Sequence, residues 1–312
     1  MGWSPRRIST VPLVLAPAAL TARSRYVFAL EADCGAGGVA AGTISLLTNG
    51  VPTSGTVAAT PDRGTSLETP FSVAAKLWVD EDLPLKYSFF SRVGEDGGED
   101  AQIVAGTLSN SYPGAILPSG LEAAGFAVVV VAHVADSFGA VGVATTSVTV
   151  EPLSTASTED LANVADALLS SALETGDSQA VAMVTVAASA ALETADCGLD
   201  ADGCPATCGA NSTAPCGGHG TCVDAACACD QGWNGPACGS SSADYEAELG
   251  LRGDLVLALD SSNANTSPSR DAFNQQATAL DSVVVEDVKS LSPEATDAAL
   301  GDLSAWLAEE ND

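Results

Sequence analysis

Basic residues are scarce in this chain of 312 residues. Only 11 Lys and Arg stand against 40 Asp and Glu, which gives a formal net charge of -29 at pH 7. A surface of this sign repels nucleic acids and anionic membranes, so we expect no nucleic-acid partner. The acidity suits an extracellular or saline setting rich in divalent cations, but it also serves solubility, and charge alone does not decide between the two.

Long apolar runs are also missing. The most apolar stretch, 126–134, contains a histidine and is soon followed by an acidic residue. A membrane-spanning helix needs about 20 apolar residues, so this stretch is interpreted as a buried strand. Arg6 and Arg7 precede an apolar segment and leave a secretory signal open. Its prolines, Pro12 and Pro17, and its lack of a clean cleavage pattern argue against one.

Histidine is limited to two residues, which restricts the catalytic chemistry available. His133 lies on a predicted strand and His219 lies among cysteines, so neither is placed to be the base of a triad. Gly176-Asp177-Ser178 is similar to the nucleophile block of one esterase family, but it is equally an ordinary helix start. No zinc-protease, Walker or dinucleotide motif is present. We expect no enzyme activity and no cofactor; a secreted hydrolase acting through Ser178 is a distant alternative.

A β-sandwich is predicted for residues 49–152, where β-branched or alternating runs are separated by proline, glycine and acidic turns. Aromatic residues are few, with 4 Trp, 4 Tyr and 7 Phe. We therefore expect Trp78, Tyr87 and Phe89, which lie close together, to anchor its core. The strands are expected at 55–60, 71–79, 85–93, 101–107, 126–134 and 141–150.

Residues 1–48 contain fewer predicted strands than a sandwich needs. Runs at 12–16, 25–32 and 41–48 have strand character. Three strands do not close a sandwich, so this part is interpreted as the C-terminal part of a truncated fibronectin-III-like domain. Cys34 lies in its glycine-rich turn without an evident partner, which fits either a free thiol or a partner upstream.

Helical periodicity begins after the sandwich. Ser157 followed by Asp160 is similar to a capping box, and Gly176 ends the pattern. With a second helix at 178–194, this predicts a helical hairpin over 153–195. We expect these helices to pack with those of a second helical segment near the C-terminus. That segment, 241–312, is expected to hold helices at 244–259, at 270–280 and from Ser292, with Pro293 in the first turn.

Eight of the nine cysteines fall within 197–238. From Cys208 onward their gaps, with Gly-Trp-Asn-Gly inside the last, make residues 196–240 similar to an epidermal-growth-factor-like (EGF-like) module. Zinc is disfavoured, because zinc ribbons need two C-x-x-C pairs or histidine at set spacing. So small a module depends on disulfides, which form outside the cytosol. The resemblance implies the pairs Cys208–Cys222, Cys216–Cys227 and Cys229–Cys238, which leaves Cys197–Cys204.

Short motifs follow one another at 46–55, 61–71, 76–90, 117–120 and 136–140. The second contains P-x-x-G-x-x-L-x-T-x-F and the third W-x-D-x-x-x-P-L-x-Y-x-F. In this order they resemble, over about residues 11–195, the receptor-for-egg-jelly (REJ) region of polycystin-type membrane proteins. Several motifs in the right order are more specific than one alone. The resemblance implies a sandwich of fibronectin-III/Ig-like type in the ectodomain of a cell-surface protein.

Other candidate sites have plainer interpretations beside them. The acidic loop 94–100 has the oxygen ligands that calcium prefers, but a solvated loop is favoured. Asn211 and Asn265 begin N-glycosylation sequons. Arg252-Gly253-Asp254 matches an integrin-type adhesion tripeptide, but it lies within a helical pattern, so chance occurrence is favoured.

The sequence thus predicts a multidomain, mainly β chain with a fibronectin-III/Ig-like β-sandwich, α-helical segments and a small disulfide-rich EGF-like module. We expect a non-catalytic extracellular segment of a polycystin/REJ-like cell-surface receptor or adhesion protein. It would bind an extracellular protein or glycan ligand, belong to a membrane-anchored parent and associate weakly with calcium. The alternative is a soluble secreted matrix or adhesion protein with an EGF-like module.

Overall fold

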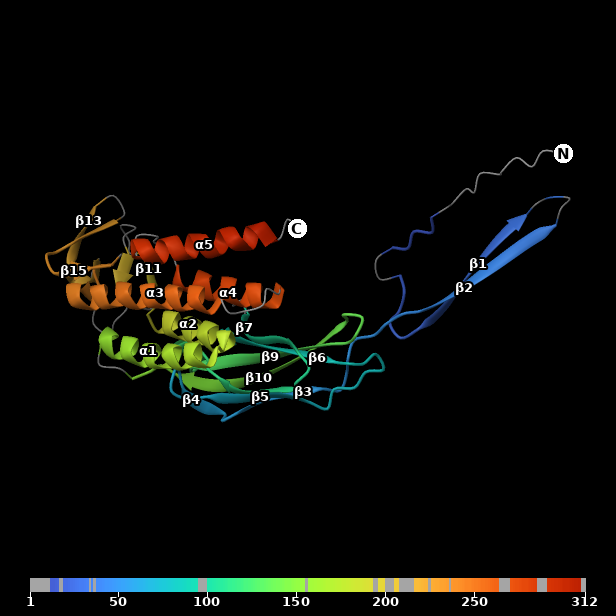
Figure 1. The fold of residues 1–312 in the computed structure, drawn as a ribbon, viewed down its shortest axis with the longest axis horizontal. Helices are drawn as coiled ribbons and strands as arrows, with labels where there is room; N and C mark the ends of the chain where they lie inside the picture. Colours follow the sequence, from blue (N-terminus) through green and yellow to red (C-terminus); the bar gives the residue numbers. More distant parts are fainter. Residues whose placement is uncertain are drawn as a thin grey trace.

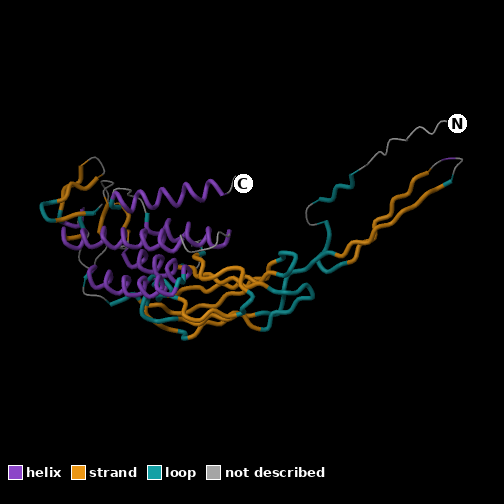
Figure 2. The backbone as a smooth tube through the Cα atoms, in the orientation of Figure 1, coloured by secondary structure: helices purple, strands orange, loops and turns teal. Residues whose placement is uncertain are grey.

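Strands dominate the first half of the chain and helices the second, with a disulfide-bonded module between helices, so the expected fold class is confirmed (Figure 1; Figure 2). The computed structural model describes the backbone of 196–199, 205–207 and 302–309, and both backbone and side chains elsewhere. Its described residues are 12–16, 19–33, 35, 38–94, 100–154, 157–192, 196–199, 205–207, 216–223, 226–235, 237–263, 270–284 and 291–309.

The N-terminal strands form an antiparallel two-stranded hairpin of β1 (Arg25–Asp33) and β2 (Val39–Leu47). The hairpin projects beyond the rest of the chain in Figure 1. Residues 12–16 form no strand, so the third strand expected there is wrong. The segment was expected to be a strand because it is apolar, but it pairs with no sheet, and Leu13 and Val14 are exposed.

Two facing sheets build the sandwich. The smaller sheet has the order β3-β5-β8 and the larger has the order β4-β10-β9-β6-β7. Neighbouring strands are antiparallel except for β4 and β10, which are parallel. The strands are β3 (Thr56–Thr60), β4 (Arg63–Thr65), β5 (Phe71–Lys76), β6 (Lys86–Val93), β7 (Ala101–Thr107), β8 (Ser111–Ala115), β9 (Ala127–Ala135) and β10 (Val141–Glu151), with a short 3-10 helix at Glu122–Ala124.

Every strand expected in the sandwich is present, and β4 and β8 are additional. β8 escaped detection because it contains Pro113, which is tolerated at a sheet edge, where β8 lies. Phe89 is fully buried in the sandwich core, as its place in the aromatic cluster predicts. Trp78 and Tyr87 pack, partly buried, against the same core.

The helices form one layered bundle although the cysteine-rich module separates them in sequence. α1 packs on α2 and α3, α2 packs on α3 and α4, and α3 packs on α5, which confirms that the two helical parts meet. Caps set their ends: Ser157 accepts a hydrogen bond from the Asp160 N–H, and Gly176 adopts the left-handed conformation. The helices are α1 (Thr158–Thr175), α2 (Ser178–Leu192), α3 (Ser242–Asn263), α4 (Arg270–Val283) and α5 (Pro293–Glu309).

The bundle and the sandwich share apolar contacts. Met183 of α2 is buried in the core of the sandwich, and Ile116 and Ala180 pack against both cores. Burial of Tyr112, on β8, raises the pKa of its hydroxyl to about 12, and the carboxylate of Asp177 contributes as a smaller cause. The sandwich and the helices therefore pack as one body.

α4 also covers an edge of the larger sheet. β7 is the last strand of that sheet, so its outer backbone groups would otherwise be unpaired. The buried side chain of Gln275 donates its amide to the carbonyl oxygens of Gln102 (3.2 Å) and Ile103 (3.1 Å). In return, Gln102 donates to the carbonyl oxygen of Asp271 at 3.1 Å. α4 thus covers part of the open edge of the larger sheet.

Short strands make up the region between α2 and α3. They are β11 (Asp196–Leu199), β12 (Pro205–Thr207), β13 (Gly220–Val223), β14 (Ala226–Cys229), β15 (Trp233–Asn234) and β16 (Ser240–Ser241), with a 3-10 turn at Cys216–Gly218. This region lies at one end of the long axis of the molecule, and the N-terminal hairpin lies at the other (Figure 1). No helix in the described part of the chain is long and apolar enough to span a bilayer.

Candidate functional site

Disulfides organise the module between α2 and α3. Cys216 is bonded to Cys227, and Cys229 to Cys238, the pairs that the EGF-like resemblance implies. Cys222 is also half of a disulfide. Its expected partner Cys208 lies outside the described residues, as do Cys204 and Cys34, and of Cys197 only the backbone is described. The pairs Cys208–Cys222 and Cys197–Cys204 therefore stay predictions.

The buried core of the module consists of Cys216 and Cys238, with Trp233 packed partly buried against it. The ring of His219 stacks on that of Trp233, with centroids 3.5 Å apart and planes 4° from parallel. Five cysteines of the module are consumed by disulfides and so offer no thiolate to a metal. The described part of the module is thus held by sulfur bridges, the antiparallel pairings β13–β14 and β15–β16, and one stacked ring pair.

The module continues directly into the first turn of α3. The Ser242 N–H donates to the carbonyl oxygen of Gly232 at 3.0 Å, and the Asn234 side-chain amide donates to the Ser242 hydroxyl at 2.8 Å. Ser241 caps the helix by accepting a hydrogen bond from the Asp244 N–H. These contacts fix the module to the helix that follows it.

The adhesion-like tripeptide has a structural role, and the sequons stay untested. In the Arg252-Gly253-Asp254 tripeptide, Arg252 is buried in α3, where it donates to the Val283 carbonyl oxygen at 2.8 Å and pairs with Glu248 at 3.2 Å. An integrin could not reach it, so chance occurrence of the tripeptide is supported. The sequons at Asn211 and Asn265 lie outside the described residues, and their glycosylation stays a prediction.

The esterase-like tripeptide is a helix start in the structure. The Asp177 carboxylate accepts a hydrogen bond from the Ala180 N–H at 3.0 Å, and α2 begins at Ser178. Both histidines of the chain contact other rings: His133 lies tilted against Phe90, and His219 stacks on Trp233 within the module. Ser178 therefore has no imidazole to activate it.

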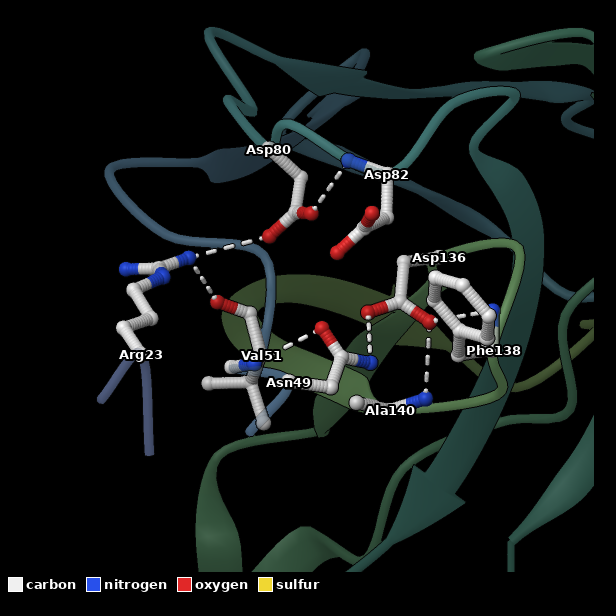
Figure 3. A network of polar contacts seen from close by, with 9 residues as sticks. Arg23, Asn49, Val51, Asp80, Asp82, Asp136, Phe138 and Ala140 are labelled. Carbon is white, nitrogen blue, oxygen red and sulfur yellow. Dashed lines mark hydrogen bonds and ion pairs between the residues drawn. The ribbon is translucent and has the colours of Figure 1, made fainter. Parts of the chain in front are cut away.

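A polar network joins the N-terminal hairpin to the sandwich (Figure 3). Asp136, which is 3% exposed, accepts hydrogen bonds from the side chain of Asn49 (2.6 Å) and from the N–H groups of Phe138 (2.8 Å) and Ala140 (3.0 Å). Burial would raise the pKa of Asp136, but these hydrogen bonds outweigh it, so the pKa is lowered. Asn49 thus fixes the start of the sandwich to a turn far along the chain.

Arg23 makes the second link of this network. It pairs with the carboxylate of Asp80 at 2.9 Å and donates to the carbonyl oxygen of Val51. Three carboxylates gather here, with oxygens of Asp80, Asp82 and Asp136 all within 4.8 Å of one another. Burial raises the pKa of Asp82, and the neighbouring carboxylates raise it further. The joint therefore concentrates negative charge that Arg23 only partly offsets.

Oxygen clusters of this kind suit hard cations, but two of the three carboxylates are already engaged by protein donors. A structural role in joining the hairpin to the sandwich therefore explains the network without a cation. It was not recognised in the sequence, where 94–100 was the calcium candidate, because its residues come from three distant turns. Residues 95–99 of that loop lie outside the described part. The signal available was that Asn49, Asp80 and Asp136 all belong to the ordered motifs.

We expect Asn49→Leu to lower the unfolding temperature by several degrees at pH 7, because the buried Asp136 carboxylate loses a donor. Because the pKa of Asp136 is lower in the folded than in the unfolded state, its carboxylate stabilises the fold fully above the unfolded pKa of about 4. This stabilisation is lost as pH falls through the folded-state pKa. The penalty should therefore shrink toward pH 3 in calorimetric scans. Asn110→Leu is the control: Asn110 donates to the Ala75 carbonyl oxygen, which does not titrate, so its penalty should be independent of pH. Equal pH dependence for both would contradict this account.

Comparison with known families agrees with this structure. A model of the REJ domain matches residues 5–187, more than half of the chain, and covers the hairpin, the sandwich, α1 and most of α2. A model of the teneurin-like EGF domain matches residues 214–241, which contain both disulfides described above. No curated protein matches the chain. Both are families of extracellular domains. The chain belongs to the REJ domain family and carries an EGF-like module.

Proposed function

We propose that the chain is a non-catalytic segment of the ectodomain of a polycystin/REJ-like cell-surface receptor or adhesion protein, which spaces and presents a surface for an extracellular protein or glycan. One observation supports this most: the sandwich and the helices on both sides of the EGF-like module share apolar contacts. The module is thus inserted into a rigid body instead of hanging from a linker.

The arrangement suits a spacer. The module lies at one end of the long axis and the hairpin at the other (Figure 1). Hydrogen bonds fix the module to α3, and the polar network fixes the hairpin to the sandwich. A force or a steric constraint applied at one end is therefore transmitted to the other end without a flexible joint between described elements.

Membrane fractionation separates a receptor from a secreted protein. We expect an antibody raised against this chain to detect its native product in the membrane pellet after extraction with alkaline carbonate, which strips peripheral proteins. Detection of the product only in the surrounding medium would overturn the receptor proposal in favour of a secreted matrix or adhesion protein.

An esterase assay tests the non-catalytic part of the proposal. The purified chain should hydrolyse p-nitrophenyl acetate no faster than the same buffer without protein. Ser178→Ala should behave identically, because Ser178 begins a helix and has no histidine beside it. Turnover that disappears in Ser178→Ala would establish a hydrolase and contradict the proposal.

A further inference from the structure

The outward face of the larger sheet of the sandwich is apolar along its central strands. The even-numbered side chains of β9 from 128 to 134 lie in the sandwich core, so its odd-numbered side chains point outward. Residues directly opposite in the register share a face, which adds the outward side chains of β6 and β10. The apolar residues of this outward face are Phe90, Val129, Val131, Ala135, Val141 and Val143.

The helices leave this outward face open to solvent. α2 and α4 pack on the sheet at β7, its edge strand, and Val141 and Val143 on β10 stay 42% and 56% exposed. The outward face of the smaller sheet differs, because it carries only small or polar side chains on β3 and β5: Thr56, Ala58, Thr60, Ser72, Ala74 and Lys76. An exposed apolar patch is typical of a contact site, so the larger sheet is the better candidate.

Acidic residues are rare in the larger sheet. Its five strands hold 38 residues, of which Glu151 is acidic and Arg63, Lys86 and Arg92 are basic. At the average of the chain, 40 Asp and Glu in 312 residues, the same length would hold about five acidic residues. A second molecule of net charge -29 is therefore repelled less at this face than at a surface of average composition.

We propose that a second copy of this chain docks on the outward face, with the two sheets stacked about a twofold axis that runs along β9. A twofold axis brings the residues beside it against their own copies, so like charges there would repel each other. β9 contains no Asp, Glu, Lys or Arg, and its outward side chains are those of Ala, Val and His133. The strand at the axis therefore meets this requirement.

The ion pairs of the outward face match the same axis. Arg63 pairs with Glu151 on one side of β9, and Arg92 pairs with Asp100 on the other side. β9 is the middle strand of five, so rotation about it places β10 over β6 and β4 over β7. Glu151 at the end of β10 then approaches Arg92 near the end of β6, and Arg63 on β4 approaches Asp100, which precedes β7. Each charge thus meets one of opposite sign on the other copy.

The size of the face sets the expected strength. A sheet residue covers about 3.4 Å by about 4.8 Å, so the 38 residues of the five strands present about 600 Å² on each copy. The two copies together lose about 1,200 Å², which is at the lower end of specific interfaces. Because the two acidic bodies also repel each other, we expect a weak dimer with a dissociation constant on the order of 50 µM.

Sedimentation equilibrium of the full chain from about 5 to about 500 µM tests the proposal. The wild-type chain should pass from monomer to dimer over this range. Val143→Lys should raise the dissociation constant at least about tenfold, because it buries a charge in the apolar contact. Ser72→Lys adds the same charge at an exposed position on the smaller sheet and should change the constant less than about threefold. Both positions are exposed, so circular dichroism should show both variants folded.

An exchange of charges tests the axis. Glu151→Arg combined with Arg92→Glu makes the Arg63 side of the face wholly basic and the Asp100 side wholly acidic. The proposed axis places these two sides against each other, so the double variant should dimerise at least about threefold more tightly than the wild type, and each single variant more weakly. A wild-type chain that stays monomeric over the whole range, equal effects of the two lysine variants, or a double variant that dimerises no better than the wild type would each overturn the proposal.

Discussion

Replacing Cys229 and Cys238 together by alanine should unfold the EGF-like module and leave the sandwich and the helices folded. Removing a disulfide from a small extracellular domain typically costs about 2–5 kcal/mol. Apart from its other disulfides and the short pairings β13–β14 and β15–β16, the described part of the module has little to hold it, since its buried core is Cys216 and Cys238 themselves. The helices should survive, because their buried core includes no residue of the module.

Limited proteolysis with mass spectrometry measures this separation. New cleavage sites should appear within 216–238 in the double variant, while the helical circular dichroism signal at room temperature is nearly retained. Thr221→Ala, on an exposed position of β13, is the matched control and should leave the module resistant. A module that resists protease without the Cys229–Cys238 bridge would show that other contacts stabilise it, and loss of the helical signal would show that the bundle depends on it.

Gly55→Ala should be among the most destabilising single methyl additions in the chain. A Cβ at Gly55, just before β3, would overlap the ring of Trp78, and one at Gly142 on β10 would overlap the same ring. The ring thus lies in a slot that only glycine leaves open. Overpacking of this kind costs about 1–3 kcal/mol and occasionally more, and we expect the upper end because Trp78 also packs on the sandwich core.

Urea denaturation of the matched variants gives the free energy of unfolding. Gly250→Ala is the control: it lies in α3 with nothing within 4 Å of its Cβ position, so it should be neutral or slightly stabilising. Combining Gly55→Ala with Trp78→Leu should recover part of the loss in a double-mutant cycle, because the smaller side chain vacates the slot. Equal stability of Gly55→Ala and Gly250→Ala would contradict the packing described here.

Most of the secondary structure could be predicted from local signals in the sequence. Ser157 and Gly176 bound α1 as predicted, since capping depends only on neighbouring residues, and Ser292 caps α5 through the Ala295 N–H. The missed strand β4 has only 3 residues and pairs in parallel with β10, far along the chain. Such a pairing leaves no local periodicity to detect.

The site was less accessible to prediction than the fold. The cysteine spacing led to the two disulfides described, because EGF-like gaps are a specific pattern. The network around Asp136 depends on turns that only tertiary folding brings together, so periodicity could not reveal it. The edge contact of Gln275 on β7 is of the same kind, since a polar residue on a helix does not indicate which backbone it will reach.

Hydrogen exchange of the intact chain, followed residue by residue, tests most directly whether the REJ sandwich and the helices form one rigid body. If they do, the slowest amides of β9, α2 and α4 should exchange with the same free energy of opening and respond in parallel to low concentrations of denaturant. If α3 and α4 exchange at much lower free energy than β9, the helices open independently of the sandwich. The rigid spacer would then be contradicted.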